Sequence, residues 1–386
     1  MGLIYDRQRK TEEAINEYLA ALEYDYRALE IHLRLAVDYI RSGQVQKAIG
    51  QLEVALKLKP EDNRPRFLLA LLYTSLGKFS EAAHQYEEIL RISPNDLNAL
   101  ASLADLYVAQ EEIEKAISIY EKLIAEEKRV DPKIYFNLAL LYIKVNKFEE
   151  ASGYLKKTID LAPSYVEPYI ALGIISEMKK EFDGAQTYYK KALELDPLNT
   201  KIYHQLAQVY RQIEMFDEAI RQYQLILTLA PDDVEAHFLL GALYEKLGKK
   251  DLATLELKRT IELEPKHADG LNYLGYMYAE DGINLDEAIS LIKKALEIEP
   301  NNGAYIDSLG WAYYKKGLFD EALIELEKAV QFLGDDPTIR DHLGDIYNQK
   351  GLDEKAKEQW EKSLGLDLKQ EKVKKKLEEI NNKLMK

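Results

Sequence analysis

Cysteine is absent from the sequence, which excludes a disulfide framework, a thiolate nucleophile and a cysteine-based zinc site. Long apolar runs are absent too: the longest uncharged stretches, such as 67–77, are shorter than the roughly 20 residues that span a bilayer, so no transmembrane segment is predicted. Basic residues are outnumbered, with 52 Lys and Arg against 67 Asp and Glu and a formal net charge of −15. Because phosphate binding requires a clustered basic face, we expect no nucleic-acid partner.

What the sequence does contain is a repeated pattern, which is clearest at 200–233. Small and apolar residues recur there at steps of three and four, with one polar break. These positions are Tyr203, Leu206, Ala207, Tyr210, Ala219, Tyr223 and Ile226. The steps match the period of an amphipathic helix, and Pro231 cannot continue a helix. The pattern therefore predicts two short antiparallel helices.

Ten such repeats follow one another along the chain. Their bounds are 29–62, 63–96, 97–131, 132–165, 166–199, 200–233, 234–267, 268–302, 303–336 and 337–370. The position of Ala219 is alanine in all ten, and the position of Ala207 is always Ala or Gly. We expect the two helices to cross closely at these positions, because a larger side chain would overpack the contact.

This pattern of small residues, large residues and proline at a 34-residue period resembles the tetratricopeptide repeat (TPR), and the resemblance covers essentially the whole chain. It implies an all-α fold: a right-handed TPR superhelix, or α-solenoid, of helix-turn-helix repeats, in which the first helices line an inner, concave surface. One hairpin cannot bury its own apolar face, so the repeats are expected to stack as one array.

The two ends of the chain differ. Residues 1–28 align with a repeat that has lost the start of its first helix, and we infer a truncated repeat of a longer natural protein, with any signal peptide or lipid anchor before residue 1. Residues 371–386 carry one narrow apolar stripe and are predicted to form a capping helix. Its lysines are expected to form a solvated face; the alternative is a surface for an anionic lipid or an acidic partner.

The turns inside the repeats carry two further signals. Residues that favour a left-handed conformation are expected where first helices end. They are Gly43, Gly77, Asn146, Gly248, Gly317 and Gly351. Short polar residues are expected to be N-caps of second helices. They are Ser80, Asp183, Asp217, Asp286 and Asp320. The eighth repeat has one extra residue, within 280–288, which predicts a tolerated loop.

Catalytic signatures are missing. The sequence has no HExxH, GxSxG or GxxxxGK[ST] motif, so zinc hydrolysis, nucleophile-elbow chemistry and P-loop phosphate binding lack their residues. His204 and His237 lie in adjacent repeats, but two imidazoles without a third ligand make a poor metal site. We therefore predict no catalytic residues, no metal ligands and no cofactor, and expect the protein not to be an enzyme.

Binding to a protein or peptide partner on the inner surface is the remaining prediction. The residues expected to face inward and to bind are Phe67, Phe136, Ile170, His204, Arg211, Phe238, Tyr276, Asp307, Trp311, Tyr314, Asp341 and Asp345. An equal alternative for the apolar members is packing between neighbouring inner helices. Trp311, with aromatic and acidic residues around it, is expected to be exposed and to be a hot spot for a segment with apolar and basic side chains.

Residues 270–316 support a closer resemblance. The pairing of NYLGYMYAEDGINLDEA with YIDSLGWAYY is similar to a subgroup of Gram-negative TPR proteins. Several of these are outer-membrane lipoproteins or periplasmic adaptors, and one tethers a carboxyl-terminal processing protease and presents cell-wall hydrolases to it. The resemblance implies a scaffold or adaptor in a bacterial cell-envelope complex, with a protease or cell-wall enzyme as partner. This chain lacks the lipid-attachment cysteine of such a lipoprotein.

Two alternatives to the envelope scaffold are kept. One is a cytoplasmic factor that assembles complexes or secretion components. The other is a self-assembling structural protein, which would form homo-oligomers through the open ends of its solenoid.

Overall fold

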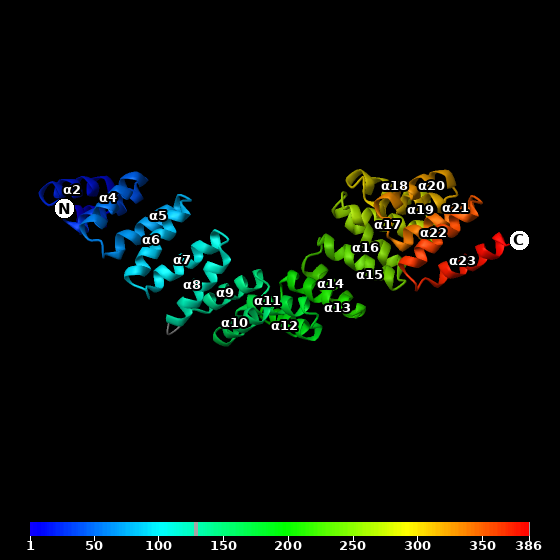
Figure 1. The fold of residues 1–386 in the computed structure, drawn as a ribbon, viewed down its shortest axis with the longest axis horizontal. Helices are drawn as coiled ribbons and strands as arrows, with labels where there is room; N and C mark the ends of the chain where they lie inside the picture. Colours follow the sequence, from blue (N-terminus) through cyan, green and yellow to red (C-terminus); the bar gives the residue numbers. More distant parts are fainter. Residues whose placement is uncertain (127–129, 386) are drawn as a thin grey trace. The chain divides into compact units, whose positions relative to one another are not determined.

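A computed structural model describes residues 1–126 and 130–385, and every regular element in those ranges is an α-helix (Figure 1). The chain divides into two compact parts, residues 1–195 and 196–386, here called the N-terminal half and the C-terminal half. No helix in the described ranges is long and apolar enough to cross a membrane.

The N-terminal half consists of short helices of similar length after the first. They are α1 (Gly2–Arg7), α2 (Thr11–Tyr24), α3 (Leu29–Arg41), α4 (Val45–Leu58), α5 (Asn63–Ser75), α6 (Phe79–Ile92), α7 (Leu97–Ala109), α8 (Ile113–Glu126), α9 (Pro132–Lys144), α10 (Phe148–Leu161), α11 (Val166–Met178) and α12 (Phe182–Leu195). The end of the predicted repeat 97–131 includes residues 127–129, which lie outside the described residues.

The C-terminal half continues the same alternation. Its helices are α13 (Thr200–Gln212), α14 (Phe216–Leu229), α15 (Val234–Lys246), α16 (Lys250–Leu263), α17 (Ala268–Asp281), α18 (Leu285–Ile298), α19 (Gly303–Lys315), α20 (Phe319–Phe332), α21 (Pro337–Gln349), α22 (Asp353–Leu366) and α23 (Glu371–Leu384). From α3 on, each first helix begins at the first residue of a 34- or 35-residue repeat. The predicted all-α fold of stacked helical hairpins is confirmed.

In the hairpins with a glycine at the position of Ala207, that glycine on the first helix packs closely against a large side chain on the second helix. A Cβ atom added to Gly173 would lie 2.4 Å from Cε1 of Tyr189, and one added to Gly344 would lie 2.4 Å from Nε1 of Trp360. The alanine at the position of Ala219 has no exposed surface in any of the ten repeats. The predicted close crossing is therefore correct, and each hairpin contains both parts of its own tight contact.

The turns inside the hairpins confirm one prediction and correct another. All six residues predicted to be left-handed have positive φ, from 59° at Asn146 to 81° at Gly317. The predicted N-caps are wrong: Asp217, for example, is the second residue of α14, whose N-cap is Met215. Four of the second helices begin at a phenylalanine or leucine that directly precedes the Asp. Each Asp is therefore in the first turn of its helix, where a carboxylate still interacts favourably with the helix dipole.

The remaining N-cap prediction fails in the same way, since Ser80 is the second residue of α6. The extra residue of the eighth repeat is accommodated between α17 and α18, where Gly282 and Asn284 both adopt positive φ, of 69° and 48°. The predicted loop is therefore a turn with two left-handed residues.

A further contact ties consecutive hairpins together. In at least six repeats, the fourth residue of the first helix bonds to a backbone carbonyl six residues earlier. These pairs are His32 with Tyr26, Arg66 with Pro60, Tyr169 with Pro163, Tyr203 with Pro197, His237 with Pro231 and Arg340 with Gly334. The distances run from 2.8 to 3.2 Å. The bond satisfies a loop carbonyl that the helices leave unpaired and anchors the loop between repeats.

Candidate functional site

Two adjoining cavities lie along the first helices of the C-terminal half. The larger has a volume of about 630 Å³ and the smaller one of about 290 Å³. Both are lined by Gln208, Arg211 and Leu239, so they form one continuous depression over α13, α15 and α17. We call this depression the inner groove. Its ends are marked by His204 in the smaller cavity and Tyr273 in the larger.

The apolar side of the inner groove is built from aromatic rings on α15 and α17. The Phe238 ring lies 5.0 Å from the His267 ring and 6.0 Å, edge to face, from the Tyr273 ring. The Tyr273 hydroxyl donates to Oε2 of Glu245 at 3.1 Å. Burial, with the nearby Glu245 carboxylate, raises the pKa of Tyr273 to about 12, so its hydroxyl remains a donor at neutral pH. The bond to Glu245 therefore orients the Tyr273 ring, which in turn packs against Phe238.

The polar side carries two cations. The Arg211 side chain is half-buried beside the hydroxyl of Tyr223; burial raises the pKa of Tyr223, and the guanidinium opposes that rise. The Lys246 ammonium lies 4.4 Å from the centre of the Phe216 ring. Within residues 1–126 and 130–385, no carboxylate lies within 4.0 Å of either cation. Both positive charges are therefore available to a ligand.

His204 closes the narrow end of the inner groove. Its Nε2 lies 3.2 Å from Oδ2 of Asp233, and its ring meets the Tyr223 ring at 5.9 Å. His237 has other partners, Oε2 of Glu256 at 2.6 Å and the Pro231 carbonyl at 3.0 Å. The two histidines are thus held apart by separate contacts. Among the residues that the structure describes, no group of three or more potential ligands could hold a metal ion.

The predicted residues of the N-terminal half occupy separate places. Phe67 lines a hollow of about 390 Å³ with Arg64 and Asn98, and its ring meets Tyr86 edge to face at 5.7 Å. The other two predicted residues of this half, Phe136 on α9 and Ile170 on α11, are half-buried. The Phe136 ring packs against Tyr165 at 5.1 Å. For Phe136 the packing alternative describes its surroundings.

Trp311 and Asp307 are buried, with only 8% and 6% of their surfaces exposed, so the prediction that Trp311 is exposed is wrong. The indole is stacked between Tyr314, at 4.9 Å, and His342, at 4.0 Å. Its Nε1 donates to Oε2 of Glu280 at 2.7 Å. The reason for the burial is that the following repeat supplies His342 as a cover.

The same histidine neutralises Asp307. His342 Nδ1 lies 3.0 Å from both carboxylate oxygens of Asp307. Burial by itself would lower the pKa of His342, but the attraction of Asp307, with that of Asp341 and Asp345, raises it above its usual value. The pair is therefore an internal ion pair and leaves no free carboxylate for a basic partner.

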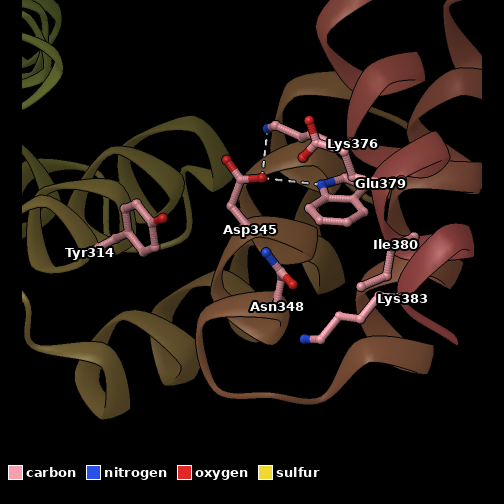
Figure 2. A pocket seen from close by; sticks show the side chains of 8 residues that line it. Tyr314, Asp345, Asn348, Lys376, Glu379, Ile380 and Lys383 are labelled. Carbon is pink, nitrogen blue, oxygen red and sulfur yellow. Dashed lines mark hydrogen bonds and ion pairs between the residues drawn. The ribbon is translucent and has the colours of Figure 1, made fainter. Parts of the chain in front are cut away.

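The last two predicted acids are also paired. Lys376 of α23 contacts Asp341 at 2.7 Å. It also contacts Asp345 at 2.6 Å (Figure 2), and Trp360 Nε1 donates to Asp345 at 3.2 Å. Burial raises the pKa of Asp345, and although burial lowers that of Lys376, the two carboxylates raise it overall. The prediction of a solvated lysine face on α23 therefore fails at Lys376, which reaches back onto α21.

Two predicted aromatic residues remain partly open. Tyr314 lines a cavity of about 410 Å³ beside Asp345 and Lys376 (Figure 2). Tyr276 lines a hollow of about 220 Å³ with Tyr273 and Asp307. Since Tyr273 also lines the inner groove, this hollow continues the groove towards α19 and α21. Of the predicted residues, the structure brings His204, Arg211 and Phe238 together in the groove itself.

Several groove residues were missed by sequence reasoning. Glu245 and Lys246 occupy the positions of Arg211 and Gln212 in the next repeat, so the repeat pattern itself could have identified them. Tyr273 and Leu239 occupy the same position of the first helix in consecutive repeats, which is the position of Gln205. That position lies between the inner face and the hairpin contact, so periodicity alone does not assign it.

Comparisons with known proteins agree with this architecture. A family model described as the N-terminal ARM repeat of tetratricopeptide repeat protein 21 matches residues 39–247, which is more than half of the chain. Two models described as tetratricopeptide repeat match residues 1–63, and residues 234–267 with 305–332. A comparison with curated proteins finds no match.

Three solved structures illustrate the likeness. The MamA protein is 32% identical over 44% of this chain and 92% of its own, with a TM-score of 0.40. The C-terminal part of a TPR protein from Cytophaga hutchinsonii is 18% identical over 63% and 99%, with a TM-score of 0.56. The APC/C hetero-tetramer Cut9–Hcn1 is 16% identical over 98% and 95%, with a TM-score of 0.52. The last two show a shared fold.

Proposed function

Because the chain belongs to the tetratricopeptide repeat family, we propose that it is a non-enzymatic scaffold that binds segments of partner polypeptides in its inner groove. Repeat solenoids offer extended concave surfaces for such binding. One observation carries the proposal: the inner groove runs without interruption across three first helices and combines an aromatic wall with unpaired cations. Apolar anchors beside a few polar groups are the usual composition of a peptide site.

The test is site-specific cross-linking of the full chain. The photoreactive residue p-benzoylphenylalanine is placed at Leu239, inside the inner groove, or at Leu255 of α16, which is 62% exposed and outside the groove. In native extract, we expect the first position to cross-link one or a few defined polypeptides that the second does not. Equal cross-linking from both positions, or none from Leu239, would contradict a groove-binding scaffold.

We also propose that the partner belongs to the bacterial cell envelope, as a protease or a cell-wall enzyme. The support is the resemblance of residues 270–316 to the envelope subgroup of Gram-negative TPR proteins. Fractionation of the full-length protein tests this: recovery with the periplasm or outer membrane is expected, and recovery in the cytoplasm would favour the assembly-factor alternative. Light scattering at several concentrations tests the self-assembly alternative, which requires a mass that grows with concentration.

A further inference from the structure

We infer that the inner groove selects a segment of another polypeptide that carries a carboxylate next to an aromatic or aliphatic side chain. The inference rests on the proposed function and specifies its ligand. In this arrangement the carboxylate is bound between Arg211 and Lys246, and the neighbouring apolar side chain lies against Phe238 and Tyr273.

The charge of the larger cavity supports an acidic ligand. It is lined by two cations, Arg211 and Lys246, and one carboxylate, Glu245, whereas the chain as a whole has 52 basic and 67 acidic residues. The other carboxylate of the groove, Glu235, is exposed and lines the smaller cavity. Glu245 already accepts from the Tyr273 hydroxyl, and no carboxylate among the described residues lies within 4.0 Å of the cations. A half-buried guanidinium without an acidic partner is suited to bind a carboxylate through two parallel hydrogen bonds.

The three acidic residues predicted to face inward point to the same ligand. Asp307 is paired with His342, and Asp341 and Asp345 are paired with Lys376. A basic segment would have to displace these internal cations, whereas an acidic segment finds its cations unpaired. The ligand charge is therefore the reverse of the basic segment that the sequence favoured.

The apolar side chain expected in the ligand follows from the aromatic and aliphatic residues that line the groove. Phe238 and Leu239 are half-buried, and the Phe238 ring is supported on two sides by His267 and Tyr273. A rigid aromatic surface beside a charged group allows one ligand residue to bury its side chain while its neighbour forms the ion pair. The carboxylate supplies specificity, and the apolar side chain supplies most of the buried surface.

The test begins with selection of a random peptide library, displayed on phage, against the full wild-type chain. Selected peptides are synthesised, and their Kd values are measured by calorimetry at low and at physiological salt. The variants are Arg211→Gln, Arg211→Lys, Lys246→Gln and Phe238→Ala, each checked by circular dichroism. Arg221→Gln is the matched control, because Arg221 lies in the same repeat but on α14, exposed and paired with Glu218.

We expect the selected peptides to be enriched in Asp or Glu next to an aromatic or aliphatic residue. Arg211→Gln should weaken binding by at least about tenfold and reduce its salt dependence, Arg211→Lys should restore part of the affinity, and Arg221→Gln should change it less than about twofold. Lys246→Gln should give an intermediate loss.

Two other outcomes separate the inference from the proposed function. Peptides without acidic residues that lose affinity with Phe238→Ala but not with Arg211→Gln would overturn the inference and leave groove binding intact. Failure to select any peptide, or equal affinity for wild type and Phe238→Ala, would overturn groove binding as well.

Discussion

The C-terminal half contains two regions with similar residues and opposite surroundings. The inner groove sets Phe238 and Tyr273 beside Arg211, and all three residues are half-buried and line an open cavity. The other region, here called the aromatic–acidic end, sets Trp311 beside Asp307, and His342 covers both. The two regions therefore differ in whether a neighbouring repeat supplies a side chain of opposite charge.

The difference arises from the charge of the side chains that the next repeat places near each position. His342 lies one repeat beyond Asp307, and Lys376, on α23, lies two helices beyond Asp341, so each acid meets a cation from a later element of the array. Arg211 meets no such acid among the described residues. An aromatic or charged residue on an inner helix thus marks a binding site only where the stacked neighbour leaves it open.

The largest expected effect comes from Trp311→Ala. It removes a buried indole stacked on two rings, so we expect a loss of about 3–5 kcal/mol in the free energy of unfolding of the C-terminal half. Phe238→Ala, at a half-buried groove residue, should cost about 1–2 kcal/mol. Hydrogen exchange of α19 and α15, followed by mass spectrometry, measures both.

The affinity for peptides is expected to respond to these two substitutions in the opposite order. Phe238→Ala should abolish binding of groove-selected peptides, and Trp311→Ala should leave their affinity almost unchanged wherever the half remains folded. If Trp311→Ala instead left stability unchanged and removed binding, the contrast between a covered and an open region would be wrong.

A smaller effect is expected for Lys376→Met, which keeps the length of the side chain and removes its charge. Asp341 and the buried carboxyl of Asp345 would then lose their cation, at a cost of about 2 kcal/mol. Lys383→Met is the matched control on the same helix, because Lys383 pairs with Asp353 from a mostly exposed position and should cost less than about 1 kcal/mol. Urea unfolding followed by the fluorescence of Trp311 and Trp360 compares them, and equal costs would contradict an internal role for Lys376.

The smallest expected effect is a pH dependence at His342. Its pKa is raised in the folded state, so its pairing with Asp307 stabilises the protein fully below the unfolded-state pKa of about 6.5, and this contribution is lost as the pH rises through the raised value. In Asp307→Asn, burial instead disfavours the protonated imidazole. The gap in unfolding free energy between wild type and this variant should therefore be widest at acidic pH and narrow as the pH rises. A gap that widened with pH would show that His342 is neutral in the folded protein.

Much of the fold could be predicted from the sequence, because its determinants lie within one hairpin. The step of three and four residues, the alanine at the position of Ala219 and the positive-φ turn at Gly317 all act between residues close in the chain. The inward placement of Arg211 and Phe238 follows from the same period, and the structure places both in one cavity.

The burial of Trp311 could not be predicted in this way. Periodicity indicates which face of a helix a residue occupies, but the cover over Trp311 comes from His342, 31 positions later. The starts of the second helices were misassigned for a related reason. A polar residue such as Asp217 is favourable both as a cap and in the first turn, and its sequence neighbours do not separate the two.

The fit of Gly344 beneath Trp360, and of Gly173 beneath Tyr189, lies inside a single hairpin. A gene segment that encodes one whole hairpin thus encodes both the glycine and the large side chain that packs on it. Duplication or loss of such a segment would leave the contact complete in every remaining hairpin. Recombination that joined the first helix of one hairpin to the second helix of another would set an indole or phenol against an alanine methyl group. Breakpoints between hairpins are therefore the ones through which an array of this kind can lengthen or shorten and still fold.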